Sequence, residues 1–273
     1  MKSNVFLFAA LTHLLIYLSP SCAAERWPEL ELRSAIAAVK PASEAVSIVK
    51  DPVYQSGKRY QAYPLRLFIS KLGKRYSGNL DQAVLVFIAS DGYKVSMSYP
   101  DALEEDGYIA FRDLDAFPDD WADFEFGREK INPAPYYLVW RKPGIDKWRY
   151  PWPFQLARIS LQPATVYYGQ AAPIEKKASV TAGFAEFGRY CIRCHAVNGS
   201  GGTVGPELNS PQNVSELYSD NQLKKLILNN RNNRPNSKMP IFDTILTGRQ
   251  IDNIMSYLKA MKMHKVGVDN AAD

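Results

Sequence analysis

The segment CIRCH, residues 191–195, holds the side chains whose types and spacing could do chemistry. Two cysteine thiols stand three residues apart, and the imidazole of His195 follows the second thiol directly. Apart from Cys22, near the start of the chain, the sequence contains no other cysteine. Such a pair can form a disulfide, contribute to a zinc site, act as a redox-active dithiol, or anchor a cofactor.

The first three alternatives fit the surrounding sequence poorly. A zinc site needs about four ligands, and this chain offers one cysteine pair with one adjacent histidine. A thioredoxin-type dithiol follows a strand, whereas Cys191 and Cys194 stand at the end of a predicted helix. A disulfide between Cys191 and Cys194 would be strained, and it would leave His195 unexplained.

Covalent attachment of haem accounts for all three side chains. Each thiol adds to one vinyl group of the porphyrin, and the imidazole of the next residue binds the iron. We therefore expect one haem c, bound through Cys191 and Cys194, with His195 as an iron ligand. The second axial position then decides between electron transfer and ligand chemistry.

Met239 is the candidate for this second axial position. It stands in the segment SKMPIF, residues 237–242, where Pro240 fixes a turn between two predicted helices. Thioether ligation raises the reduction potential and suits electron transfer. The alternative for a single methionine is core packing, and the rival ligands Met263 and His264 lie near the chain end.

Three helices are predicted around these residues. The first runs into the CIRCH segment, with Ser179 or Thr181 as its cap. The second covers residues 221–230. In the third, Thr247 and Gln250 form a capping box. The apolar positions of the three helices are Phe184, Phe187, Leu223, Leu226, Ile227, Ile251, Ile254, Leu258 and Met261.

The region before these helices predicts short strands and turns. The turn signal Asp91-Gly92 joins two strand-length segments, so we expect a β-hairpin there. The four segments that predict strands are residues 83–90, 93–99, 136–140 and 154–161. After them, residues 162–177 contain two prolines and no clear periodicity, which predicts a linker between two domains.

The chain ends complete the predicted organisation. Residues 1–24 have the layout of a signal peptide, with one lysine, an apolar run, and small residues before a cleavage point after Ala24. An uncleaved membrane anchor is the alternative, and no later segment has the apolar length of a membrane span. We expect an N-terminal extension at residues 25–57 and a flexible tail at residues 267–273.

The charge distribution narrows the class of partner. The chain carries 33 Lys and Arg against 28 Asp and Glu, and the excess lies after residue 175, where 13 basic residues face 8 acidic ones. The sequence lacks an arginine-rich run with interleaved aromatic residues, so we expect no nucleic-acid partner. Arg193, Lys224, Lys225 and Lys238 could orient an acidic redox protein.

Residues 178–263 resemble a class I cytochrome c, and we expect its domain to span residues 178–266. The resemblance rests on Gly183, Phe187, GPEL at residues 205–208, MPIF at residues 239–242 and Tyr257. It implies an all-α domain whose first and last helices cross through the glycine and the two aromatic residues. In this family a prolyl carbonyl accepts a hydrogen bond from the proximal histidine, which maps onto Pro206 and His195. Because c-type haem is attached outside the cytoplasm, the resemblance also implies a periplasmic protein.

Residues 58–161 are similar to the molybdopterin-binding domain of the sulfite oxidase superfamily. The similar segments are YPLRLFISKLG (63–73), ASDGYKVSMSYPD (89–101), GYIAFRDL (107–114), PYYLVW (135–140) and FQLARISL (154–161). The similarity implies a mixed α+β domain. That family holds its molybdenum through a protein cysteine, and this region contains none. We therefore expect a domain without molybdopterin.

These expectations describe a multidomain chain, in which an N-terminal mixed α+β domain precedes an all-α cytochrome c domain. The favoured function is that of an exported monohaem electron carrier rather than an enzyme. The alternative is an oxidoreductase whose N-terminal domain keeps a pterin or small-molecule site and passes electrons to the haem. A haem sensor or peroxidase requires an open sixth position, and Met239 argues against it.

Overall fold

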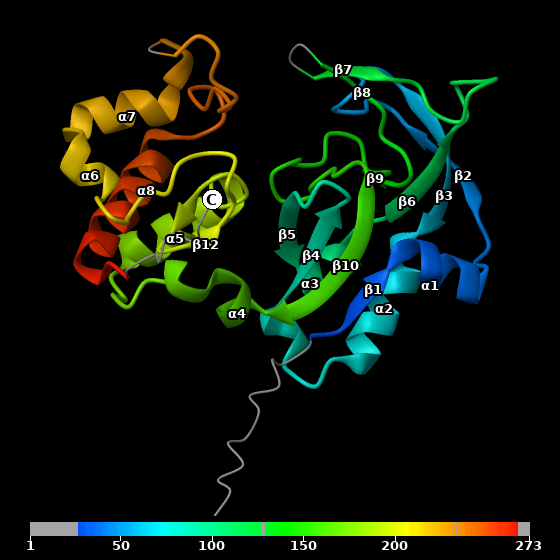
Figure 1. Ribbon diagram of the computed structural model, residues 1–273, viewed down its shortest axis with the longest axis horizontal. Helices are drawn as coiled ribbons and strands as arrows, with labels where there is room; N and C mark the ends of the chain where they lie inside the picture. The colour runs from blue at the N-terminus through cyan, green and yellow to red at the C-terminus, as the bar shows by residue number, and fades with distance from the viewer. Residues whose placement is uncertain (1–26, 127–128, 233, 267–273) are drawn as a thin grey trace, which may run out of the picture.

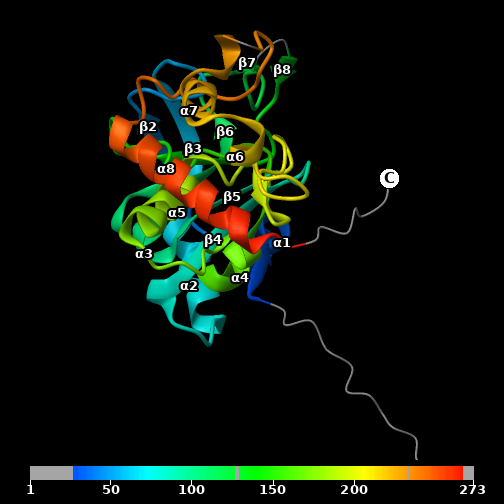
Figure 2. The same ribbon diagram turned by 90° about the vertical axis from the view of Figure 1, so that its left-hand side faces the viewer.

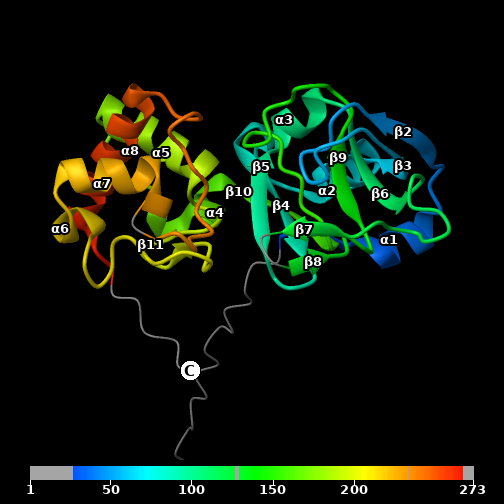
Figure 3. The same cartoon turned by 90° about the horizontal axis from the view of Figure 1, so that it is seen from above.

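The computed structural model describes residues 27–126, 129–232 and 234–266. Two lobes lie side by side, a sheet-rich N-terminal lobe and a helical C-terminal lobe (Figure 1 and Figure 3). The predicted signal peptide, residues 1–24, and the predicted tail, residues 267–273, lie outside the described residues. Within the described residues, no helix combines the length and the apolar character needed to cross a membrane.

Antiparallel strands build the N-terminal lobe. They are β1 (Glu29–Glu31), β2 (Glu44–Ile48), β3 (Lys58–Pro64), β4 (Ala83–Ala89), β5 (Lys94–Ser98), β6 (Gly107–Asp113), β7 (Phe124–Phe126), β8 (Glu129–Ile131), β9 (Tyr137–Trp140) and β10 (Leu156–Pro163). One four-stranded sheet has the order β1-β10-β4-β5, and a second has the order β2-β3-β6-β9. The strands β7 and β8 pair separately.

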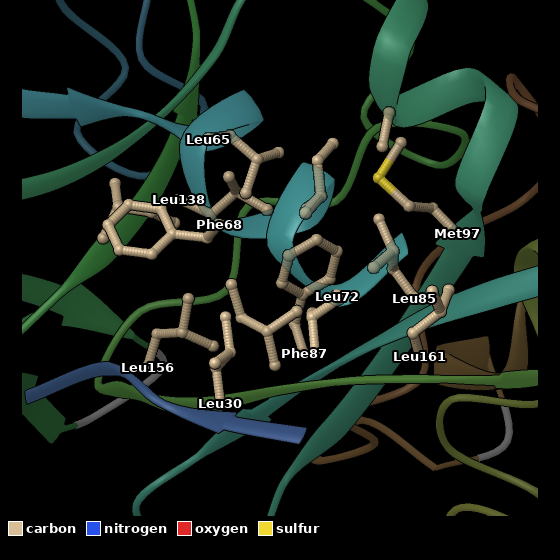
Figure 4. Close-up of a cluster of buried hydrophobic side chains, with 14 of the residues drawn as sticks. Leu30, Leu65, Phe68, Leu72, Leu85, Phe87, Met97, Leu138, Leu156 and Leu161 are labelled. Atoms are coloured by element: carbon tan, nitrogen blue, oxygen red, sulfur yellow. The ribbon is translucent and has the colours of Figure 1, made fainter. Parts of the chain in front are cut away.

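The main core of this lobe is built from both sheets and from the helices packed on them. The helices of the lobe are α1 (Leu32–Val39), α2 (Leu65–Arg75) and α3 (Tyr99–Glu104), with a 3₁₀ turn, η1, at Leu80–Gln82. On α2, Leu65, Phe68 and Leu72 are spaced three and four apart, so they share one face, and all three are buried. Figure 4 shows them packed with Phe87 of β4 and Leu156 of β10.

The predicted hairpin is confirmed, because β4 and β5 pair antiparallel across the Asp91-Gly92 turn. The backbone N–H of Tyr93 donates to the carboxylate of Asp91 at 2.9 Å. Gly92 has φ of +89°, which favours glycine. The other two predicted strands correspond to β9 and β10.

The segment predicted as an N-terminal extension, residues 25–57, contributes to both sheets, which corrects that prediction. β1 pairs with β10, where Leu30 stands opposite Ile159. β2 pairs with β3, where Val46 stands opposite Tyr60. All four of these side chains are buried, so the lobe begins well before residue 58.

The C-terminal lobe is mainly helical. Its helices are α5 (Ala178–Tyr190), α6 (Val214–Leu217), α7 (Asp220–Leu228) and α8 (Gly248–Met261), with 3₁₀ turns η3 (Asn230–Asn232) and η4 (Lys262–His264). The expected all-α domain also contains a short hairpin of β11 (Ala196–Val197) and β12 (Ser200–Gly201), which corrects that expectation.

The predicted N-cap of α8 is correct, and the predicted N-caps of α5 are not. The capping box of α8 is confirmed, because the side chains and backbone N–H groups of Thr247 and Gln250 bond reciprocally. The predicted caps of α5, Ser179 and Thr181, are wrong. Both lie inside the helix, whose N-cap is Lys177 without a side-chain cap bond.

The first and last helices of the C-terminal lobe cross at very short range. Figure 2 shows α8 running across α5. A Cβ at Gly183 would overlap the backbone carbonyl of Asn253 on α8. Beside this point the rings of Phe187 and Tyr257 lie 5.1 Å apart between centroids. Glycine therefore permits the approach that the two aromatic rings fill.

The predicted linker, residues 162–177, is a packed joint between the lobes. It holds the end of β10, the helix α4 (Ala164–Tyr168) and a 3₁₀ turn, η2 (Gly169–Ala171). Tyr168 packs against the outer face of β4 and lies 5.1 Å from the ring of Phe184 on α5. The hydroxyl of Tyr257 donates to the carbonyl of Ala171 at 2.7 Å.

The helix crossing gives a stability prediction. We expect Gly183→Ala to destabilise the protein by about 1–3 kcal/mol, because the added methyl group forces α5 and α8 apart. Gly248→Ala is the matched control, since a Cβ at this first residue of α8 meets nothing within 4 Å; it should stay within about 0.5 kcal/mol of the wild type. Urea unfolding followed by circular dichroism measures both, and equal midpoints would contradict the close crossing.

Candidate haem-attachment site

The two cysteines and His195 lie on a tight turn at the end of α5. Cys191 caps the helix, and its backbone N–H donates to the carbonyl of Phe187 at 2.9 Å. The backbone N–H groups of Cys194 and His195 both donate to the carbonyl of Cys191, at 3.0 and 2.9 Å. Both thiols are free. The turn thus gathers two thiols and one imidazole without a disulfide between them.

The imidazole of His195 is oriented by the loop that follows. Its Nδ1 lies 2.8 Å from the carbonyl oxygen of Pro206. A carbonyl oxygen can only accept, so Nδ1 carries the hydrogen and Nε2 keeps its lone pair for a metal. Burial lowers the pKa of His195 below its ordinary value, although the Pro206 bond opposes this effect. The ring is therefore neutral at pH 7, as metal ligation requires.

The pKa values of the two thiols are shifted in the opposite direction to those of a redox-active dithiol. Burial raises the pKa of the Cys191 thiol to about 12, and it also raises the pKa of the Cys194 thiol. Reactive CxxC sites instead lower the thiol pKa to form a thiolate. A raised thiol pKa disfavours exchange through a thiolate, and covalent cofactor attachment is a chemistry that would use both thiols.

Two glycines allow the next loop to lie directly against the CIRCH segment. The backbone N–H of Gly202 donates to Ile192, and that of Gly205 donates to Cys194, both at 2.7 Å. A Cβ at Gly202 would overlap the backbone of Arg193, and a Cβ at Gly205 would overlap the ring of His195. The sequence predicted no role for either glycine, because each is required by a contact that only the folded loop creates.

A polar network that the sequence did not predict ties this loop to α8. The carboxylate of Glu207 accepts from the backbone N–H groups of Asn198 at 2.9 Å, Gly199 at 3.0 Å and Asn209 at 2.8 Å. The side chain of Asn209 donates to Asn198 at 2.7 Å and to the carbonyl of Met261 at 2.9 Å. Asn198 and Asn209 are buried, so their satisfied amides fix the loop that carries Pro206.

Met239 lies at the edge of the same hydrophobic cluster as Cys191, where both are half-buried. The backbone N–H of Met239 donates to the hydroxyl of Ser237 at 3.2 Å. The side chain of the rival ligand Met263 is 78% exposed, whereas that of Met239 is half-buried. Met239 is therefore the better placed of the two for packing or for ligation. Of the residues predicted for the haem site, the structure gathers Cys191, Cys194, His195 and Pro206 in one turn and loop, and Met239 lies at the edge of the hydrophobic cluster that includes Cys191.

Of the four basic residues predicted to orient a partner, two form contacts within the protein and two are exposed. Arg193, named with the lysines as a side chain that could orient a partner, is half-buried, and its guanidinium donates to the carbonyls of Trp148 and Arg189 at 3.0 and 2.8 Å. Lys224 pairs with Asp252 at 3.2 Å. Lys225 and Lys238 are exposed.

The N-terminal lobe has a separate cavity of about 760 Å³. Trp121, Asp119, Asp120, Asp123 and Asn132 are among the residues that line it. Across the described residues, no group of three or more His, Cys, Asp or Glu side chains is arranged to hold a metal ion.

Two free thiols and a carbonyl-oriented imidazole on one turn are the side chains that covalent haem attachment uses. The donors fit haem c, because the thiols supply both attachment points and Nε2 of His195 supplies a lone pair. Residues 180–262 match the family described as Cytochrome c. This match supports a C-terminal class I cytochrome c with covalently bound haem and an electron-transfer function. No curated protein matches the chain.

The close packing of Gly205 on His195 gives a second prediction. We expect Gly205→Ala to push the imidazole away from Pro206, which lowers the covalent haem content and adds a high-spin fraction. The overpacking should also destabilise the protein by about 1–3 kcal/mol. The haem-to-protein absorbance ratio and the electron paramagnetic resonance spectrum measure these effects.

Thr203→Ala is the control for this prediction, since Thr203 is exposed in the same loop. It should behave as the wild type. A Gly205→Ala protein with full haem content and an unchanged low-spin spectrum would show that the loop does not position His195.

Proposed function

We propose that this chain is an exported monohaem c-type cytochrome that transfers electrons between redox proteins. The observation that carries the proposal is the turn of two free thiols followed by His195, whose Nδ1 lies 2.8 Å from the carbonyl of Pro206. The Cytochrome c match of residues 180–262 supports the same conclusion. Electron transfer between proteins needs no substrate pocket, so the proposed function does not require one in this fold.

In this proposal Cys191 and Cys194 anchor the haem, and His195 and Met239 are its axial ligands. A bound haem supplies an iron that alternates between Fe(III) and Fe(II). The Pro206 carbonyl keeps the proton on Nδ1 of His195, which fixes the ring and raises its basicity as a ligand. The thioether of Met239 favours the reduced state and raises the potential.

The proposed partners are acidic redox proteins. Lys225 and Lys238 are exposed, and Lys238 directly precedes Met239. The C-terminal region as a whole carries the basic excess of the chain. Such a surface speeds encounter with an acidic partner, and salt weakens the effect. The signal-peptide layout of residues 1–24 supports the proposed periplasmic address.

The N-terminal lobe is proposed to be a sulfite-oxidase-type scaffold without its metal cofactor. Its strands β4, β5, β6, β9 and β10 fall within or beside the segments that carry the similarity. The lobe contains no cysteine to bind molybdenum. The second candidate function is an oxidoreductase whose N-terminal lobe passes electrons to the haem, and the open pocket beside Trp121 is where its small molecule would bind. Stoichiometric pterin or molybdenum in the purified protein would put that candidate first.

The axial assignment gives the third prediction. Met239→Ala should abolish the far-red charge-transfer band of the ferric protein that reports a methionine sulfur on iron, and it should lower the reduction potential. Absorption spectra and a redox titration of the holoprotein measure both effects.

Met263→Ala is the matched control, because it removes a methionine that is 78% exposed. Its spectrum and potential should equal those of the wild type. Loss of the band in Met263→Ala with its retention in Met239→Ala would overturn the assignment of Met239.

A further inference from the structure

Trp148 belongs to the N-terminal lobe by sequence but packs against the C-terminal lobe. It stands in the connection between β9 and β10 and is half-buried. Its ring lies 5.5 Å from that of Tyr190 and 5.4 Å from that of Phe242, measured between centroids. Tyr190 directly precedes Cys191, and Phe242 follows Met239 by three residues. Trp148 therefore touches both segments that carry the proposed haem ligands.

Arg193, inside the CIRCH segment, holds the same tryptophan. Its guanidinium lies 5.1 Å from the centroid of the Trp148 ring, within the range of a cation–π interaction. It also donates to the backbone carbonyl of Trp148 at 3.0 Å. The ring and the backbone of Trp148 are thus both fixed to the attachment turn.

The loop that presents Trp148 is itself anchored in the N-terminal lobe. The backbone N–H of Trp148 donates to the carboxylate of Asp146 at 2.9 Å. The neighbouring Arg149 forms two hydrogen bonds to the carboxylate of Asp101, at 2.9 and 2.6 Å. Tyr150 packs on Trp140 of β9 at 5.1 Å between centroids. Hydrogen bonds and ring packing thus anchor the loop that presents Trp148 in the N-terminal lobe, and an anchored loop can restrain the residues that it touches.

We infer that Trp148 is a positioning residue that holds the segment of Met239 against the haem-attachment turn. The inference rests on the proposed function, in which Met239 is the axial ligand. Movement of the Met239 segment away from the attachment turn would let an external ligand replace the thioether. Besides Trp148, the hydrogen bond from the N–H of Phe242 to the carbonyl of Leu228, 2.8 Å long, restrains this segment. The N-terminal lobe thereby keeps the haem six-coordinate.

The test is an imidazole titration of the ferric holoprotein, followed by loss of the methionine charge-transfer band. In Trp148→Ala we expect imidazole to bind about tenfold more tightly than in the wild type, which is the size of effect that two aromatic contacts and one cation–π contact support. Trp148→Phe keeps part of the ring packing and should give an intermediate affinity. This second variant also carries the test if Trp148→Ala fails to fold.

Trp27→Ala is the control, because Trp27 is a tryptophan of the same lobe that packs on Tyr76 instead. It should bind imidazole as the wild type does. Equal imidazole affinity in the wild type, Trp148→Ala and Trp148→Phe, with the methionine band present in all three, overturns the positioning role and leaves the proposed function intact. Absence of the band from the wild type overturns the axial assignment and the inference together.

Discussion

The close crossing of α5 and α8 at Gly183 is the constraint on which the haem-attachment site depends. A single glycine lets the two helices approach until a side chain no longer fits between them. α5 then delivers the two cysteines at its C-terminal end, while the end of α8 receives the amide of Asn209 from the loop. The crossing therefore fixes both sides of the turn that holds His195, and the rings of Phe187 and Tyr257 make it a stable contact.

The chemistry of the site follows from how closely backbone surrounds the CIRCH segment. Gly202 and Gly205 bring the loop against it, and the carbonyl of Pro206 then sets the tautomer of His195. Burial at the same turn raises the pKa of the Cys191 thiol, which disfavours disulfide exchange through a thiolate. The packing of the loop against the CIRCH segment thus also sets the hydrogen bonding of His195.

Local signals in the sequence predicted what local contacts determine. Asp91-Gly92 specifies its turn through a side-chain bond two residues away, and Thr247 and Gln250 cap α8 across one helical turn. The CIRCH segment is local in the same sense. Pairings between distant segments were not predicted. β1 is three residues long and finds β10 at the other end of the lobe, so no short-range pattern reports it.

The same distinction explains the joint between the lobes. Residues 162–177 lack periodicity because α4 is short, yet Tyr168 packs on both lobes, a property visible only in three dimensions. Trp148 likewise has no motif around it, since its partners Tyr190 and Phe242 come from two later segments. The contacts between the lobes join segments that are far apart in the sequence. Predicting each half separately therefore does not reveal them.

Covalent haem attachment is the central claim, and the mass of the denatured protein tests it most directly. The chain would be produced in a host that matures c-type cytochromes, extracted with acidified acetone, and weighed beside a Cys191→Ser/Cys194→Ser variant. The account predicts that the wild-type polypeptide retains the mass of one haem and its absorbance, and that the double variant retains neither. A wild-type polypeptide that loses all haem to the solvent, or never carries it, would contradict the account.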